Sequence, residues 1–164
     1  MLDERLAASL KGRLAIHQAR YRHSKEELGR IWIQLDGREI AAFSTAPALR
    51  RRREIADELM DANDLWGSST AYHEADRTAL ELMTKRGEQS DYTAWHDLEA
   101  YLSLSIDAAL LSPNPLIRGL AFADRRLGKR RLMSQSPGVG EHALIREIYA
   151  ARCAAEGIDL DRDV

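Results

Sequence analysis

The chain has 164 residues, of which 45% are hydrophobic and 30% charged, and its formal net charge is −2 at pH 7. Such a chain fits one domain, residues 1–164, and its apolar content excludes a wholly disordered protein. Acids and bases interrupt the apolar residues near the N-terminus, so we expect no secretory signal, no membrane span and a cytoplasmic protein. The single cysteine, Cys153, excludes an internal disulfide and a zinc site built on several thiolates.

The first third of the chain predicts a short helix and then an antiparallel meander over residues 13–43. Leucines at positions 2, 6 and 10 recur at the spacing of one helical stripe. The segment RIWIQL alternates apolar and polar residues, as a half-buried strand does. Asp36-Gly37 follows it, and this pair favours a type I′ hairpin turn because both positions require positive φ. We expect strands at residues 13–22, 29–35 and 38–43.

The remainder, residues 46–156, has helical spacing. Ser44 or Thr45 is expected to cap a first helix over about 46–62, with Pro47 in the first turn, where its missing N–H costs nothing. A second helix is expected to end near Gly87. The third is expected to bury one apolar stripe, formed by Trp95, Leu98, Leu102, Ile106 and Ala109.

Asn114 and Pro115 are expected to begin a fourth helix, and Gly157 to end the last one, at about 141–156. An acidic tail occupies residues 157–164. The predicted fold is therefore α+β, with an N-terminal three-stranded antiparallel meander packed by about four to five helices.

The segment LIRGLAFADRRLGKRRL, residues 116–132, contains six basic residues and one acid. On one continuous helix from Pro115, Arg118, Phe122, Arg125 and Lys129 would share a face opposite the leucines. That face could bind a phosphate backbone or an acidic protein surface, or its arginines could interact with the helix dipole and cover apolar surface. The candidate binding residues are Arg118, Phe122, Asp124, Arg125, Arg126, Lys129, Arg130 and Arg131.

A second basic run, Arg50 to Arg53, precedes a group of acids. Arg50–Glu54 and Arg53–Asp57 are spaced as i,i+4 pairs on a helix. We therefore expect this run to be neutralised locally and to form a solvated face.

Two stretches of the chain carry a family resemblance. The segments WHDLEAYLSLSIDAALLSPNPLIRGLAFADRRLGKRRL and RIWIQLDGREIAAFS resemble a family of small uncharacterised bacterial proteins with a late D-R-R-x-G-K-R-x-L element. Residues 124–132 are the most specific part of the match. The resemblance implies no activity and no cofactor, only a shared element that includes Trp95, Asp124, Arg125, Arg126, Gly128, Lys129 and Arg130.

Two histidines precede carboxylates at helical spacing. His73 lies three residues before Asp76, and His96 three residues before Glu99. Helix bundles use such pairs in metal sites, so a metal-dependent hydrolase is one alternative function. Those sites need further carboxylates facing the same interior, and exposed pairs of this kind are more common. We therefore expect no metal site and no cofactor.

The three tryptophans, Trp32, Trp66 and Trp95, are predicted to be packing residues. Trp32 lies on the strand face opposite Ile31 and Ile33, and its exposure would favour a protein interface. Together these patterns predict a non-enzymatic cytoplasmic protein of the immunity or antitoxin type that binds a partner protein. The alternatives are a nucleic-acid-binding protein that uses the basic segment, and the hydrolase. A homodimer through the third strand or the Trp32 face stays open.

Overall fold

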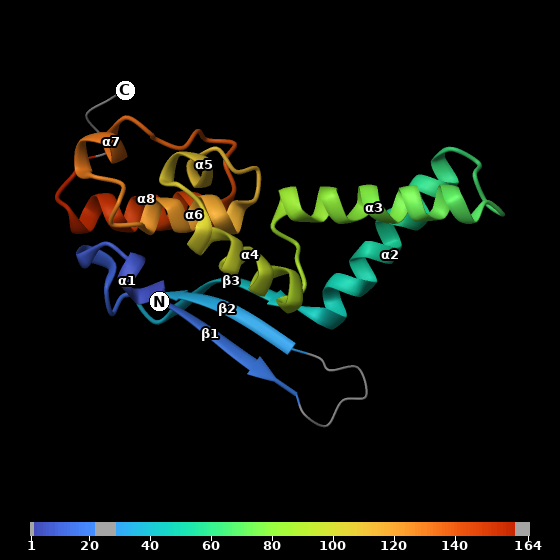
Figure 1. The fold of residues 1–164 in the computed structure, drawn as a ribbon, viewed down its shortest axis with the longest axis horizontal. Helices are drawn as coiled ribbons and strands as arrows, with labels where there is room; N and C mark the ends of the chain where they lie inside the picture. Colours follow the sequence, from blue (N-terminus) through green and yellow to red (C-terminus); the bar gives the residue numbers. More distant parts are fainter. Residues whose placement is uncertain (1, 22–28, 160–164) are drawn as a thin grey trace.

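The computed structural model describes residues 2–21 and 29–159. A three-stranded antiparallel sheet in the order β1-β2-β3 lies near the N-terminus and helices follow it, which confirms the α+β prediction (Figure 1). The strands are β1 (Leu14–Arg20), β2 (Gly29–Leu35) and β3 (Arg38–Ser44). Residues 22–28, which include His23 and the predicted end of the first strand, lie outside the described residues.

The turn between β2 and β3 has the predicted type I′ geometry. Asp36 and Gly37 have φ values of 52° and 78°. The guanidinium of Arg13 donates two hydrogen bonds to the Asp36 carboxylate, at 2.8 and 2.7 Å, and thereby ties β1 to this turn. The turn fixes a register in which Ile31 and Ile33 are both buried against the helices.

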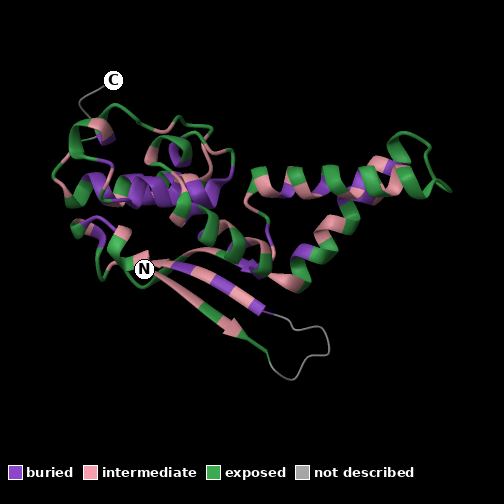
Figure 2. Cartoon of the chain, viewed as in Figure 1, coloured by how far each residue is buried: buried purple, intermediate pink, exposed green. Residues whose placement is uncertain are grey.

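The helices are α1 (Leu2–Arg5), the 3-10 helix η1 (Ala8–Leu10), α2 (Thr45–Ala62), α3 (Ser69–Arg86), α4 (Asp91–Ser103), α5 (Ile106–Leu110), α6 (Pro115–Ala123), α7 (Lys129–Met133) and α8 (Ala143–Ala155). Helix α6 lies at the centre of the main core, where it packs against α4, α5 and α8 (Figure 2). Its N-cap, Asn114, accepts a hydrogen bond from the Leu116 N–H at 2.9 Å, as predicted. No helix of the described chain is both long and apolar enough to cross a bilayer.

Two predicted helices are each interrupted. The third ends at Ser103, Leu104 is extended, and Ser105 caps the short α5. The fourth ends at Ala123, because Asp124 is extended and forms a β-bridge with Leu6. The prediction of one continuous helix through residues 115–129 is therefore wrong. At both interruptions the backbone forms hydrogen bonds with other parts of the molecule, which are described below.

Helices α2 and α3 form a hairpin, here called the arm, that projects from the rest of the molecule (Figure 1). Each helix has 18 residues and so extends about 27 Å. The arm has its own small hydrophobic cluster, separate from the main core, formed by Ala48, Ile55, Ala56, Met60, Ala75, Ala79 and Met83. The residues at its distal end are themselves exposed (Figure 2).

Among the described residues, hydrogen bonds at two places attach the arm to the body. At the first, the Thr45 hydroxyl accepts a hydrogen bond from the Gly29 N–H at 3.4 Å and donates one to the Asp91 carboxylate, so the first residues of β2, α2 and α4 meet. At the second, the His142 ring accepts from the Leu144 N–H through Nδ1 at 3.2 Å. Its Nε2 therefore donates to the Arg86 carbonyl at 3.1 Å and joins α3 to α8.

Gly29 is required by the first attachment point. A Cβ at this position would lie 1.9 Å from Oδ2 of Asp91. We predict that Gly29→Ala lowers the free energy of unfolding by about 1–3 kcal/mol, because Asp91 must move away from Thr45. Gly138→Ala is the matched control, since a Cβ there meets no atom within 4 Å. Urea denaturation of both variants measures this, and equal stabilities would contradict the prediction.

Candidate functional site

The predicted basic face does not form. Phe122 is buried in the core, with 1% of its surface exposed, and it packs edge-on against Tyr149. Asp124 is fully buried. Because the chain leaves the helix at Asp124, the basic residues before and after it no longer share one helical face.

Four of the six basic side chains bind other parts of the molecule. Arg118 pairs with Glu141 at 2.9 Å, Arg126 pairs with Asp124 at 2.7 Å, and Arg131 pairs with Asp107. Lys129 donates to the Glu156 carbonyl, just after α8, at 2.7 Å. Of these six, the exposed side chains of Arg125 and Arg130 form no hydrogen bond or ion pair with an acceptor in the described chain.

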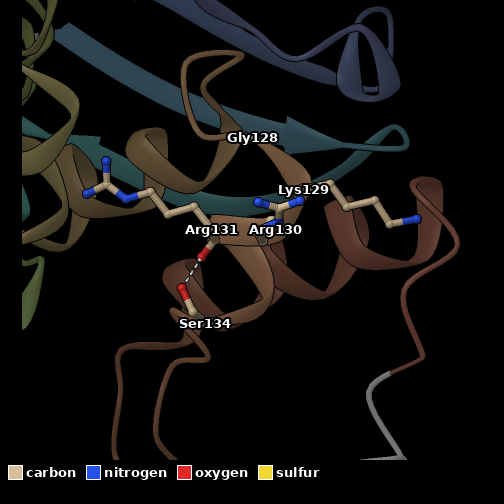
Figure 3. A pocket seen from close by; sticks show the side chains of 5 residues that line it. All are labelled: Gly128, Lys129, Arg130, Arg131 and Ser134. Atoms are coloured by element: carbon tan, nitrogen blue, oxygen red, sulfur yellow. Dashed lines mark hydrogen bonds between the residues drawn. The ribbon is translucent and has the colours of Figure 1, made fainter.

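A shallow cavity of about 640 Å³ lies over α7 and is lined by Gly128, Lys129, Arg130, Arg131 and Ser134. Figure 3 shows that the Lys129 and Arg131 side chains point away from each other. Both are directed to the internal acceptors named above. The cationic side chains around the cavity therefore do not point to a common position at which one anion could bind.

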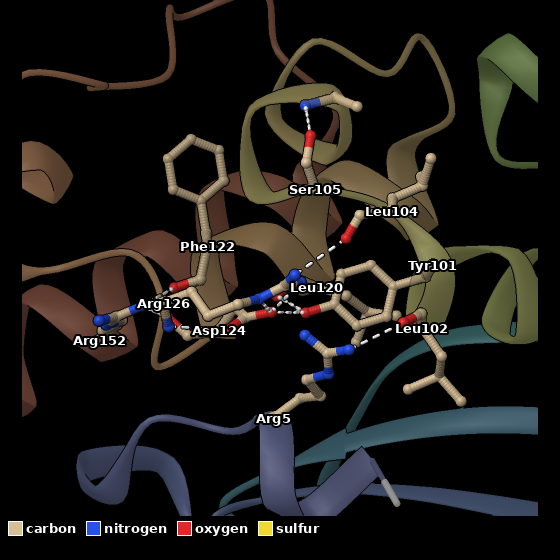
Figure 4. Close-up of polar contacts among 11 residues, drawn as sticks. Arg5, Tyr101, Leu102, Leu104, Ser105, Leu120, Phe122, Asp124, Arg126 and Arg152 are labelled. Atoms are coloured by element: carbon tan, nitrogen blue, oxygen red, sulfur yellow. Dashed lines mark hydrogen bonds and ion pairs between the residues drawn. The ribbon is translucent and has the colours of Figure 1, made fainter.

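The buried centre of the segment is a hydrogen-bonded ion pair (Figure 4). Asp124 accepts from the Arg126 backbone N–H at 2.8 Å, from the Arg126 guanidinium at 3.0 and 2.7 Å, and from the Tyr101 hydroxyl. Burial alone would raise the pKa of Asp124, but the hydrogen bonds from Arg126 and Tyr101 outweigh burial and lower it. Burial raises the pKa of Tyr101 far above its ordinary value, so its hydroxyl remains a donor.

A second arginine, Arg152 of α8, holds the backbone around Asp124. Only 2% of its surface is exposed, and it donates to the Phe122 carbonyl at 2.8 Å, the Asp124 carbonyl at 2.6 Å and the Leu127 carbonyl. The Glu156 carboxylate accepts a hydrogen bond from the Arg152 Nε at 2.9 Å and balances the charge of the guanidinium. The guanidinium thus binds carbonyls that the end of α6 leaves without helical partners.

The same network includes the N-terminal segment and the interruption between α4 and α5. The Arg5 guanidinium donates to the Leu102 carbonyl at 2.9 Å, and Arg126 donates to the Leu104 carbonyl at 2.9 Å. Backbone hydrogen bonds of 2.8 Å join Ala7 to Ala123 and Arg125 to Arg5. Through these contacts, residues 124–131 join the N-terminal segment, α4, α6 and α8. This region is here called the junction.

Of the four candidate metal ligands, His96 and Glu99 lie near each other, whereas Asp76 is bound by an arginine. Asp76 of α3 binds Arg52 of α2 with a hydrogen bond of 2.6 Å. His96 of α4 lies 3.6 Å from Glu99, and its ring contacts Tyr92 edge-on. His73 is exposed. Among the described residues no group of three or more His, Cys, Asp or Glu side chains could hold a metal ion.

Trp32 is half-buried on the sheet face opposite the core. Its ring stacks on His17 with centroids 5.1 Å apart, and the Arg30 guanidinium lies 5.2 Å from its centroid. Arg30 is in turn bound to Glu39 by two hydrogen bonds. This row of side chains covers much of the Trp32 ring.

The other two tryptophans are exposed, so the prediction that they pack in the core is wrong. Trp95 is 41% exposed on α4, and its indole donates to Glu99 at 3.0 Å. Trp66 is 55% exposed in the turn between α2 and α3, where its indole donates to Asp61. The neighbouring Leu65 is 41% exposed.

The turn that carries Leu65 and Trp66, residues 61–68, is here called the arm tip. Its backbone is held by hydrogen bonds from the Leu65 N–H to the Met60 carbonyl at 3.1 Å and from the Ser68 N–H to the Leu65 carbonyl at 3.3 Å. Asp64 and Gly67 have positive φ values of 50° and 95°. The Ser68 hydroxyl caps α3. Two large apolar side chains are therefore exposed on an ordered turn.

One pattern in the sequence indicates this surface. From Glu54 to Asp76, with both included, there are seven acids and no lysine or arginine, although the chain as a whole is nearly neutral. Tryptophan and leucine lie in the middle of that interval, beside Gly67 and two serines, where a turn is expected. The helical spacing of the flanking segments carried no information about which end of the hairpin projects.

The fold and the junction define an α+β protein with an N-terminal three-stranded meander and a helical body stabilised by a buried aspartate–arginine network. The model of the SF0329 protein family matches residues 1–153, so the chain belongs to this uncharacterised family. The match includes the sheet, the arm and the junction. No curated protein and no solved structure matches the chain.

The lowered pKa of Asp124 predicts a pH-dependent contribution to stability. The unfolded carboxyl binds a proton near pH 3.9, whereas the folded one binds it only at lower pH. The contribution of Asp124 is therefore complete above about pH 5 and decreases as the pH falls through this interval. We predict that Asp124→Asn is less stable than the wild-type protein at pH 7, and that the difference becomes smaller near pH 3. Urea denaturation at both pH values measures it.

Asp36→Asn is the matched control, because Asp36 also pairs with an arginine but lies at the surface. We expect this variant to change the free energy of unfolding little, whereas Asp124→Ala should cost about 3 kcal/mol by leaving Arg126 and Tyr101 without their acceptor. A difference between wild type and Asp124→Asn that stays constant with pH would contradict the assigned role of Asp124.

Proposed function

We propose that the protein is a non-enzymatic binding module that engages a partner protein through the arm tip. The observation that carries this proposal is the exposure of Leu65 and Trp66 on the ordered turn at the end of a projecting hairpin. Tryptophan is among the residues that contribute most to protein interfaces, because its rigid ring buries a large apolar area at a small cost in conformational entropy. A projecting tip also reaches a partner without a clash between the two bodies.

We place this function in the bacterial cytoplasm and compare it with that of immunity and antitoxin proteins, which act by binding another protein. The one cysteine is free and buried, which suits a reducing compartment. The charge distribution supports the comparison, since acids concentrate on the distal half of the arm and cations around the junction. Such a separation orients a charged partner during association.

Nucleic-acid binding is supported less well by the same contacts. Four of the six basic side chains between Leu116 and Leu132 bind acceptors within the molecule, and a phosphate backbone would have to compete for them. Arg125 and Arg130 are available at the surface. Two cations provide a small electrostatic contribution to binding and a shallow dependence on salt.

The test is capture of a partner from the native host at low salt, with and without nuclease treatment, using tagged wild-type protein and two variants. Trp66→Ala removes the exposed ring of the arm tip. Trp95→Ala is the matched control, because Trp95 is also exposed and its indole also donates to a carboxylate. We expect wild type and Trp95→Ala to retain the same protein in stoichiometric amount, and Trp66→Ala to bind it at least about tenfold more weakly.

Equal retention by Trp66→Ala would contradict the proposal. Retention that is abolished by nuclease would favour nucleic acid instead. In that case, Arg125→Glu with Arg130→Glu should remove binding, whereas Trp66→Ala should leave it unchanged.

A further inference from the structure

We propose that the arm tip recognises a basic protein surface in which lysine or arginine side chains border an apolar pocket. This inference rests on the proposed function, and it adds the chemistry of the partner. It follows from three observations: the negative charge at the arm tip, the hydrogen bond that leaves only the apolar ring of Trp66 exposed, and the ordered backbone of the turn.

The acids of the distal arm are only partly neutralised. Glu54 and Glu58 lie 3.2 and 4.0 Å from the Arg51 guanidinium, and Asp76 pairs with Arg52. These pairs differ from the i,i+4 pairs that the sequence suggests, neither of which forms among the described residues. Asp57, Asp61, Asp64 and Glu74 are not paired with a cation by any of these contacts.

Except for Arg77 in the middle of α3, the cations of the arm lie at its opposite end. Arg50 to Arg53 occupy the first turns of α2, and Lys85 and Arg86 the last turn of α3, next to the body. The arm is thus negative where it projects and positive where it is attached. A positively charged partner surface is therefore attracted at long range only by the projecting end of the arm.

The hydrogen bond between the Trp66 indole and Asp61 determines what the tip presents. The only polar group of the ring already has its acceptor, so the exposed part is the apolar ring. A carboxylate lies at the edge of that ring. A guanidinium or ammonium group of a partner can therefore stack on the ring and bind the carboxylate at the same time.

The turn is ordered before binding. Asp64 and Gly67 adopt positive φ values that few other residues tolerate, and the Ser68 cap fixes the start of α3. Little further ordering is needed when Leu65 and Trp66 enter a pocket. Surfaces rich in phosphate are repelled by the same acids, and this argues against DNA, RNA and anionic membranes as occupants of this site.

The experiment uses the full-length protein and an amphipathic peptide of leucine and lysine as the probe, with a leucine–glutamate peptide of the same pattern as the control. Isothermal titration calorimetry measures both affinities at about 50 mM and about 500 mM NaCl, because surface charge pairs are screened at the higher concentration. We expect the leucine–lysine peptide to bind, at least about tenfold more weakly at high salt, and the leucine–glutamate peptide not to bind.

Two variants divide the interaction into its parts. Asp57→Asn/Asp61→Asn/Asp64→Asn removes three charges but keeps an acceptor for the Trp66 indole, and asparagine tolerates the positive φ at position 64. Trp66→Ala removes the ring. We expect each to weaken peptide binding at least about tenfold, with an unchanged midpoint of thermal unfolding. The controls on α4, Trp95→Ala and Glu99→Gln, should bind the peptide as the wild type does.

Each remaining outcome has a distinct meaning. If the leucine–lysine peptide does not bind, or binds no better than the leucine–glutamate peptide, the inference is overturned. If Trp66→Ala weakens binding and the triple variant does not, the tip uses apolar contact alone, so the inference fails while the proposed function stands. If neither variant differs from the wild type, and Trp66→Ala also captures the host partner normally, both fail.

Discussion

The contacts of Asp124 hold together the parts of the helical body. Its carboxylate is fully buried and accepts hydrogen bonds from Arg126 and Tyr101, while carbonyls of the backbone around it accept hydrogen bonds from Arg152. A charge in an apolar interior is costly unless each of its hydrogen-bonding positions is matched. Here the match requires α4, α6 and α8 to meet at one point. The polar network therefore specifies one arrangement of these helices as well as stabilising it.

The two helix interruptions are a consequence of that junction. When α6 ends at Ala123, the chain pairs with the N-terminal segment and the freed carbonyls bind Arg152. When α4 ends at Ser103, the carbonyls of Leu102 and Leu104 become acceptors for Arg5 and Arg126. Continuous helices would have kept these carbonyls within their own hydrogen-bond ladders. The loss of regular helix is compensated by charge-assisted hydrogen bonds from arginine, which are stronger than neutral ones.

The junction also changes the meaning of the basic segment. Its cations hold the body together, so a dense run of arginines leaves only Arg125 and Arg130 unengaged among the described residues. Acids without a cationic partner among these contacts gather instead on the distal half of the arm. The arm has only a small cluster of alanine, methionine and isoleucine side chains, and its orientation depends on the contacts of Thr45 with Gly29 and Asp91 and of His142 with Arg86. The binding surface that we propose at its tip is thus positioned by contacts distant from it.

The sequence by itself determined those features that depend on local spacing and turn chemistry. Alternation in RIWIQL, the Asp36-Gly37 pair and the cap at Asn114 each act within a few residues, and the sheet, its hairpin and the start of α6 follow from them. Only the tertiary structure decided where the long helices break, because the partners that stabilise the breaks, Arg5 and Arg152, are far away in the chain. It also decided that Trp95 is exposed. Trp95 occupies a helical stripe compatible with a core, and its exposure depends on which face of α4 the body leaves uncovered.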